Sequence, residues 1–178
     1  MDIVQQVTAE PRGARFYRVD LHIHSFGSSH DVKDPTMTPQ AIVEMAVAEG
    51  LGVIAITDHN EITNVSAAVT AVGDHPLLVI PAVELSTPQG HLLCYLPSLD
   101  SLQKFYASLD IVGRGTPESR CQNALLDCMN HLHQLGGFGV LAHVDTNAGF
   151  EHEVPGGSPH KVDILCHPAL LGVEVKFG

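Results

Sequence analysis

Residues 18–24 read RVDLHIH. Apolar and polar side chains alternate through this stretch, which is typical of a half-buried β-strand. Because successive side chains of a strand point to opposite faces, we expect His22 and His24 on one face with Asp20 beside them. The other face would carry Val19, Leu21 and Ile23. Two imidazoles on one face can bind the same metal ion, so the stretch predicts a metal site as well as a strand.

Potential metal ligands also stand at the ends of three further apolar stretches: GVIAIT (52–57), LLVIPAVE (77–84) and FGVLAH (138–143). These ligands are His59, Glu84 and His143. The carboxyl ends of parallel strands converge on one mouth of an α/β barrel, where active sites form. Chance would scatter such side chains between both ends of the strands, so their recurrence predicts a shared metal site.

The rest of the chain alternates between strand-like and helix-like patterns. Further strands are predicted at 91–96, 162–166 and 170–177, and a long loop at 145–161. Helices are predicted at 39–49, 61–72, 98–112 and 117–135. This alternation favours an α/β fold with a parallel sheet or barrel.

Composition restricts the class of protein. The chain has 178 residues, which suits one domain, and a net charge of −11, which argues against nucleic-acid binding through a basic surface. It contains 12 His, more than its 9 Lys and Arg together. Neither a membrane-spanning apolar run nor a signal peptide is apparent. The four Cys form no C-x-x-C pair and sit beside apolar residues, which favours buried thiols and a cytoplasmic protein.

The motifs resemble those of a known family. DLHIHS (20–25), ITDHN (56–60), PAVELS (81–86) and LAH (141–143) are similar, in order and placement, to the first four motifs of PHP (polymerase and histidinol phosphatase) domains. The resemblance covers residues 18–178. It implies a distorted (βα)7 barrel that hydrolyses phosphoesters with two or three divalent metal ions. Within the family, the sequence most resembles PHP domains found at the amino end of larger, ATPase-fused proteins.

The resemblance also implies roles for individual residues. One metal ion would be bound by His22 and His24, and Glu84 would bridge it to a second. The second ion would be completed by His91 and His143, and a third would be bound by His59 and an acid shortly after the first motif. The implied ligands are therefore His22, His24, Asp31, His59, Glu84, His91 and His143.

The acid after the first motif has competitors. Asp31 lies seven residues after His24, farther than is usual in the family, and His30 and Asp34 lie close to it. Two other acids, Asp20 and Asp58, neighbour ligand histidines and are expected to orient imidazoles from outside the metal shell. The alternative for Asp58 is a helix N-cap.

The last family motif, an Asp-x-His, has no match before Gly178. We therefore expect residues 18–178 to be a PHP-type domain cut before its last strands, after an N-terminal extension at 1–17 and with a possible fused C-terminal domain. The alternative is a short native protein that ends on a docked strand. The missing motif also leaves open whether these 178 residues are active by themselves.

The expected reaction is hydrolysis of a phosphoester by a metal-bound hydroxide. The substrate would be a small phosphoester or a nucleotide, with nucleic acid only as a possible substrate. Manganese, zinc and iron all suit mixed imidazole and carboxylate ligands. Basic side chains that could reach a phosphate are Lys33, Arg114, Arg120 and Lys161.

Two alternative functions differ in class. Amidohydrolases also carry H-x-H after a first barrel strand, but many use a modified Lys on a middle strand, and none of Lys33, Lys104, Lys161 and Lys176 ends one. A metal-bound regulatory or structural module without catalytic activity is the second alternative.

Other potential ligands have simpler interpretations. His131 and His133 form a second H-x-H within a helical pattern, and residues two apart on a helix do not face each other. We expect surface or cap roles for them. Asp145 and Glu174 stand where they could reach the site, but a loop role for Asp145 is an equal alternative.

Overall fold

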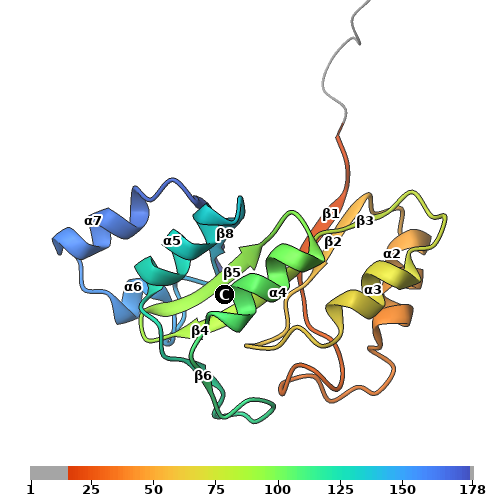
Figure 1. Ribbon diagram of the computed structural model, residues 1–178, viewed down its shortest axis with the longest axis horizontal. Helices are drawn as coiled ribbons and strands as arrows, with labels where there is room; N and C mark the ends of the chain where they lie inside the picture. Colours follow the sequence, from red (N-terminus) through yellow and green to blue (C-terminus); the bar gives the residue numbers. More distant parts are fainter. Residues whose placement is uncertain (1–15, 177–178) are drawn as a thin grey trace, which may run out of the picture.

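The computed structural model describes residues 16–176, which form a mixed α/β fold (Figure 1). A parallel sheet contains β1 (Val19–Ile23), β2 (Val53–Ile56) and β3 (Leu78–Val79), in that order. Two helices, α2 (Pro39–Ala48) and α3 (Val65–Ala71), pack against this sheet. Their contact is a buried apolar cluster that includes Ile42, Val43, Ala46, Ile54, Ile56, Ala68 and Val79.

A second sheet contains β4 (Ala82–Thr87), β5 (Gly90–Tyr95), β8 (Phe138–Leu141) and β9 (Leu170–Val173), in that order. The β4–β5 and β5–β8 pairs are antiparallel, and the β8–β9 pair is parallel. Helices α4 (Leu99–Ala107) and α5 (Leu125–Gln134) contribute to its largest apolar cluster. The remaining elements are the β6 (Ile111–Val112) and β7 (Arg120–Cys121) pair, α6 (Phe150–Glu153) and α7 (Pro159–Leu165).

The two sheets meet where β2 ends. An isolated parallel bridge pairs His59 with Glu84 of β4, and the backbone N–H of Asn60 donates to the Glu84 carbonyl at 2.7 Å. Between the sheets lies a third apolar cluster, which joins Ala55 of β2 to residues of the second sheet such as Leu93. This junction brings the ends of β1 and β2 to the middle of β4, where Glu84 lies.

The α/β class is confirmed, whereas a closed (βα)7 barrel is not. The strand pairing of residues 16–176 gives separate three-, four- and two-stranded sheets without closure. Antiparallel pairing arises because β4 and β5 are joined by the two-residue turn Pro88-Gln89. Gly90 ends that turn with φ +109°, and a Cβ there would lie 2.8 Å from the backbone nitrogen of Phe150.

Several predicted elements differ from the observed ones. Residues 162–166 were expected as a strand, but 162–165 belong to α7 and Cys166 follows it as the C-cap. The first turn of α7 is capped by Ser158 Oγ, which accepts from Lys161 N–H. The stretch 77–84 is interrupted at Ile80-Pro81, since Pro lacks the N–H that a continuous strand would use. The observed helices α3, α4 and α5 are shorter than the helices predicted at 61–72, 98–112 and 117–135. The β6–β7 pair lies between α4 and α5 and limits both.

The single apolar face expected for β1 is also wrong. The strand shifts register against β2 between Asp20 and Ile23. As a result Ile23 packs with the cluster under α2, whereas Leu21 packs between the sheets. Val19 is half exposed.

Three thiols are buried as expected, at Cys94, Cys121 and Cys128, but Cys166 is exposed. No helix within residues 16–176 has the length and apolar character needed to cross a membrane. The strand predicted at 170–177 is too long, because β9 ends at Val173 and residues 174–176 are not part of a strand. Nearly all of the predicted extension at 1–17, and residue 177, lie outside the described residues.

Candidate metal centre

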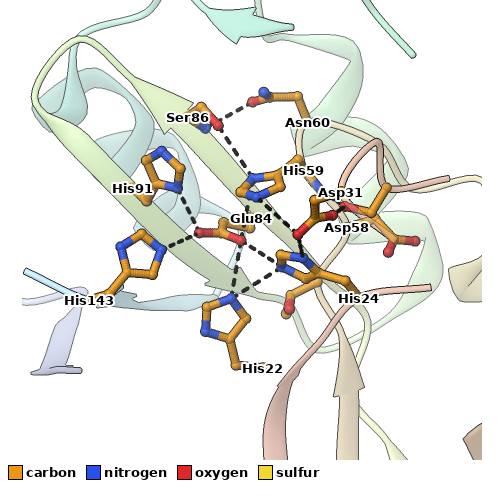
Figure 2. Close-up of polar contacts among 12 residues, drawn as sticks. His22, His24, Asp31, Asp58, His59, Asn60, Glu84, Ser86, His91 and His143 are labelled. Carbon is orange, nitrogen blue, oxygen red and sulfur yellow. Dashed lines mark hydrogen bonds and ion pairs between the residues drawn. The ribbon is translucent and has the colours of Figure 1, made fainter. Parts of the chain in front are cut away.

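Glu84, in β4, is the centre of a cluster of histidines (Figure 2). Its side chain is 0% exposed. Five imidazole nitrogens surround its two oxygens: His91 Nδ1 (2.8 Å) and His143 Nε2 (3.2 Å) at Oε1, and His24 Nε2 (2.8 Å), His22 Nε2 (3.1 Å) and His59 Nδ1 (3.4 Å) at Oε2. We call these six residues the Glu84 cluster. The structure thus brings together six of the seven side chains expected to bind metal.

The fold explains how distant residues converge. His22 and His24 come from the end of β1, His59 follows β2, and His143 follows β8. These four lie at carboxyl ends of strands, as predicted. His91 differs, because it lies at the amino end of β5, opposite Ser86 in the β4–β5 register. The antiparallel hairpin therefore brings it back to the same edge of the sheet.

Two of the histidines have an acid at the far side of the ring. His24 Nδ1 lies 2.8 Å from Asp31 Oδ2, and His22 Nδ1 lies 3.0 Å from Glu174 Oε2. Asp31 is itself fixed by Ser29, whose hydroxyl donates at 2.6 Å. Asp31 also lies 3.9 Å from His59 Nε2. From the sequence, Glu174 was only one of the acids that could reach the site. Its position directly after a strand, like that of the predicted ligands, is the feature that indicates this role.

The geometry favours Asp31 over its competitors as the acid of the first motif. Asp34 is engaged in its own loop, where it accepts from the Thr36 N–H and hydroxyl. The ring of His30 lies beside that of His59, with centroids 5.0 Å apart and the two planes tilted by 31°. His30 is therefore a neighbour of the site, and Asp31 is the residue that contacts two of its rings.

The acids expected to orient imidazoles make different contacts. Asp58 is fully buried and accepts from both the N–H (2.6 Å) and the hydroxyl (2.5 Å) of Ser25, so it fixes the loop that follows β1. Asp20 accepts from the backbone N–H of His22 at 3.3 Å. Asp145 is exposed and accepts from the Lys176 N–H at 2.9 Å, which is the loop role.

Two residues of the site have unusual backbone geometry. Among non-glycine residues of the part of the chain described, positive φ angles occur at Asn60 (51°) and His143 (30°). Left-handed backbone is costly outside glycine and concentrates at functional sites. Asn60 is fixed there because its side chain accepts from Ser86 N–H at 3.0 Å and donates to the Ser119 carbonyl at 3.1 Å.

The charges within the cluster are strongly coupled. Burial alone would lower the pKa of His24, but its hydrogen bond to Glu84 and the charges of Glu84 and Asp31 outweigh burial and raise it to about 9. Burial lowers the pKa of His59 to about 4 against the attraction of Glu84. Although burial opposes ionisation of Glu84, hydrogen bonds from the histidines, His143 first, hold its pKa well below the usual range.

The hydrogen-bonding pattern fits metal ligation. His22 and His24 each face Glu84 with Nε2 and another acid with Nδ1, and their Nε2 atoms lie only 3.2 Å apart. A neutral imidazole has one N–H, so both rings would have to be cations to donate at both ends. With a cation bound at the Nε2 side, each ring can stay neutral and donate from Nδ1 to its acid, the usual arrangement of metal-binding histidines.

Three groups of side chains can each hold an ion. In each group the ligand atoms lie within 4.8 Å of one another: His22, His24 and Glu84; His24, Asp31 and His59; His59, Glu84 and His91. The groups share members, and Glu84 belongs to two of them. Ions bound by these groups would therefore share ligands.

Comparisons with known proteins agree with this geometry. A 5'-3' exoribonuclease of Haemophilus influenzae is 34% identical over 70 residues, which are 39% of this chain and 24% of that protein. A two-domain Bacteroides vulgatus protein containing a predicted PHP-like metal-dependent phosphoesterase matches 88% of this chain and 43% of its own, with a TM-score of 0.61 and 17% identity. The lesion-specific endonuclease Q of Pyrococcus furiosus matches 74% of this chain and 35% of its own (TM-score 0.58, 18% identity).

At these identities the two structures show a shared fold, and the chain spans less than half the length of each of these relatives. The model of the PHP domain family matches residues 20–156, a stretch that contains the whole Glu84 cluster. The chain therefore belongs to the PHP domain family, whose members include metal-dependent hydrolases.

Proposed function

We propose that the protein is a metal-dependent phosphoesterase whose divalent ions are bound by the Glu84 cluster. The observation that carries this proposal is the arrangement of His22 and His24, which both turn Nε2 toward one buried carboxylate and Nδ1 toward a separate acid. Two or three ions, manganese, zinc or iron, suit these ligands. Bound there, they would lower the pKa of a water and neutralise phosphoryl oxygens.

The side chains of this chain have defined parts in that proposal. Glu84 would bridge two ions, since each of its oxygens faces a different set of histidines. Glu174 would orient the ring of His22, and Asp31, which contacts the ring of His24, would also bind an ion together with His59. Asp58 would keep the loop after β1 in place through Ser25.

Nucleotide or nucleic-acid phosphoesters are the substrates we propose. The matched exoribonuclease and endonuclease Q are both named for acting on nucleic acids. The chain itself carries a net charge of −11, so bound cations would be needed to reverse the local field for an anionic substrate.

The amidohydrolase alternative is less well supported. Lys104 and Lys161 form ion pairs with Asp100 and Glu151 on helices away from Glu84, and Lys33 donates to the His30 carbonyl. None of the lysines within residues 16–176 contacts Glu84, the residue that would bridge the ions in this proposal. A metal-bound module without catalysis stays an alternative that the activity assay below decides.

The proposal is tested by Glu84→Gln, with Glu118→Gln, an exposed acid, as a matched control. Protein purified without chelator would be analysed for bound metals and assayed on p-nitrophenyl phosphate, bis-(p-nitrophenyl) phosphate and an oligonucleotide. We expect bound metal and hydrolysis in the parent and the control, and loss of at least one ion with about 100-fold lower activity in Glu84→Gln. A parent without bound metal would contradict the proposal. Equal occupancy of every ion in Glu84→Gln would exclude the bridge.

A further inference from the structure

A cleft with a volume of about 360 Å³ lies directly beside the Glu84 cluster. His91 and Ser86 form its wall toward the cluster. Elsewhere it is lined by Arg120, Gln122 and Glu153, among others. Ligand pockets typically begin at about 300 Å³, so this cleft has room for one nucleotide-sized group.

Arg120, the first residue of β7, is the cation of this cleft. Its Nη1 donates to the carbonyls of Ser119 (2.6 Å) and Pro117 (3.2 Å), which fixes the guanidinium in place. Its other donors, Nε and Nη2, have no acceptor in the described part of the chain, and no carboxylate pairs with it there. A guanidinium that is oriented but not neutralised is suited to bind a phosphate with two parallel hydrogen bonds.

Hydrogen bonds connect Arg120 to the metal centre. The Ser119 carbonyl that accepts from Arg120 also accepts from Asn60 Nδ2 at 3.1 Å. Asn60 in turn accepts from the Ser86 N–H at 3.0 Å and donates its own N–H to the Glu84 carbonyl at 2.7 Å. The β6–β7 pair is therefore held in a fixed position relative to the candidate centre.

The other basic side chains named from the sequence are placed differently. Lys161 Nζ is paired with Glu151 at 2.7 Å, and Arg114 lies 4.5 Å over the Tyr106 ring. Lys33 donates to the His30 carbonyl at 2.5 Å. None of these three lines the cleft that His91 and Ser86 share with Arg120.

The cleft also contains an acid, Glu153, which is exposed and lies 3.7 Å from His152. A free inorganic phosphate would be repelled by this carboxylate. A nucleotide offers an anionic phosphate to Arg120 together with ribose hydroxyls or base amino groups that Glu153 and Gln122 could bind. The mixed charge of the cleft therefore favours a nucleotide unit.

We propose that this cleft binds the nucleotide next to the scissile phosphoester, with Arg120 binding a phosphate that does not react. The inference rests on the proposed function, because the centre beside the cleft must act on a phosphoester. It makes Arg120 a specificity residue, which distinguishes substrates with a second phosphate from simple phosphoesters.

The test compares binding of dithymidylates that carry a terminal phosphate at the 5′ end, at the 3′ end or at neither end. Affinities for Mn²⁺-loaded protein would be measured by calorimetry, and the recovered ligand checked by chromatography. Where a dithymidylate is cleaved, initial-rate KM values replace affinities. The variants are Arg120→Gln and Arg120→Lys. The control is Arg114→Gln, which removes the same charge from the loop between β6 and β7.

We expect a terminal phosphate at one of the two ends, 5′ or 3′, to strengthen binding about 10-fold relative to the ligand without a terminal phosphate. A charge-assisted hydrogen-bonded pair has an effect of this size. Arg120→Gln should abolish that gain, Arg120→Lys should keep part of it, and Arg114→Gln should keep all of it. KM for bis-(p-nitrophenyl) phosphate, which lacks a second phosphate, should change less in Arg120→Gln than KM for a dithymidylate with the terminal phosphate that binds Arg120. The inference is overturned if neither terminal phosphate strengthens binding, or if the gain survives in Arg120→Gln. Failure of the proposed function would instead appear as a parent that hydrolyses no phosphoester.

Discussion

The chain contains two H-x-H pairs. The rings of one pair converge on Glu84, whereas the rings of the other pair point to separate neighbours. His22 and His24 lie on β1, where both rings turn to Glu84 and their Nε2 atoms are 3.2 Å apart. His131 and His133 lie on α5, where they diverge: His131 contacts Ser108 Oγ at 2.9 Å, and His133 approaches the His167 ring with centroids 6.1 Å apart. The same spacing makes a site on a strand and not on a helix, because side chains repeat every 2.0 residues on the strand and every 3.6 on the helix.

The most severe test of this comparison removes each pair in turn. We expect His22→Ala/His24→Ala to lower metal affinity and phosphoesterase activity by more than about 100-fold, because two ligands of one ion are lost. His131→Ala/His133→Ala should leave both unchanged. Metal analysis and initial rates on bis-(p-nitrophenyl) phosphate measure the two effects. Equal losses in the two double variants would contradict a difference between the strand pair and the helix pair. Circular dichroism would show whether either variant is unfolded.

Stability and metal affinity should depend on pH through His24 of the strand pair. In metal-free protein the pKa of His24 is raised to about 9, above the ordinary 6.5, so protonated His24 stabilises the fold fully below pH 6.5 and loses that contribution as pH rises toward 9. Metal binding must displace that proton, so metal affinity should rise over the same range, by at most about 10-fold per pH unit.

Thermal unfolding with chelator and Mn²⁺ titrations, each from pH 6.5 to 9, measure the two trends. A metal affinity that does not change with pH over this range would show that His24 is not a ligand. His131→Ala/His133→Ala should reproduce the parent in both measurements.

A smaller effect is expected at Glu174, which contacts the ring of His22 from the side away from Glu84. Glu174→Gln should lower metal affinity about 10-fold, since partners of ligand rings orient them without touching the ion. The same change at the exposed Glu118 is the control. Unchanged affinity in Glu174→Gln would mean that His22 is oriented by Glu84 alone.

Much of the site could be predicted because its ligands follow strands with clear patterns. GVIAIT and FGVLAH are apolar runs that end at the predicted positions, and β2 and β8 lie within them. Strand direction was not predictable in the same way. The Pro88-Gln89 turn makes β5 antiparallel, and His91 thereby joins the cluster from the amino end of its strand.

The errors arose where short local signals compete with tertiary pairing. Ser158 and Pro159 begin α7, but the apolar residues that follow them suggested a strand. The helix predicted at 98–112 ends at Ala107 because residues 111–112 pair with 120–121 across a loop. Such pairings depend on residues distant in the sequence. The position of Arg120 beside the candidate centre depends on the same β6–β7 pair.

The central claim is that the strand H-x-H, and not the helix H-x-H, holds metal with Glu84. Anomalous diffraction from Mn²⁺-soaked crystals, recorded at the manganese edge, tests it most directly. We expect a peak about 2.0–2.3 Å from His22 Nε2, His24 Nε2 and a Glu84 oxygen. Anomalous density confined to His131 and His133, or absent from the Glu84 cluster, would contradict it.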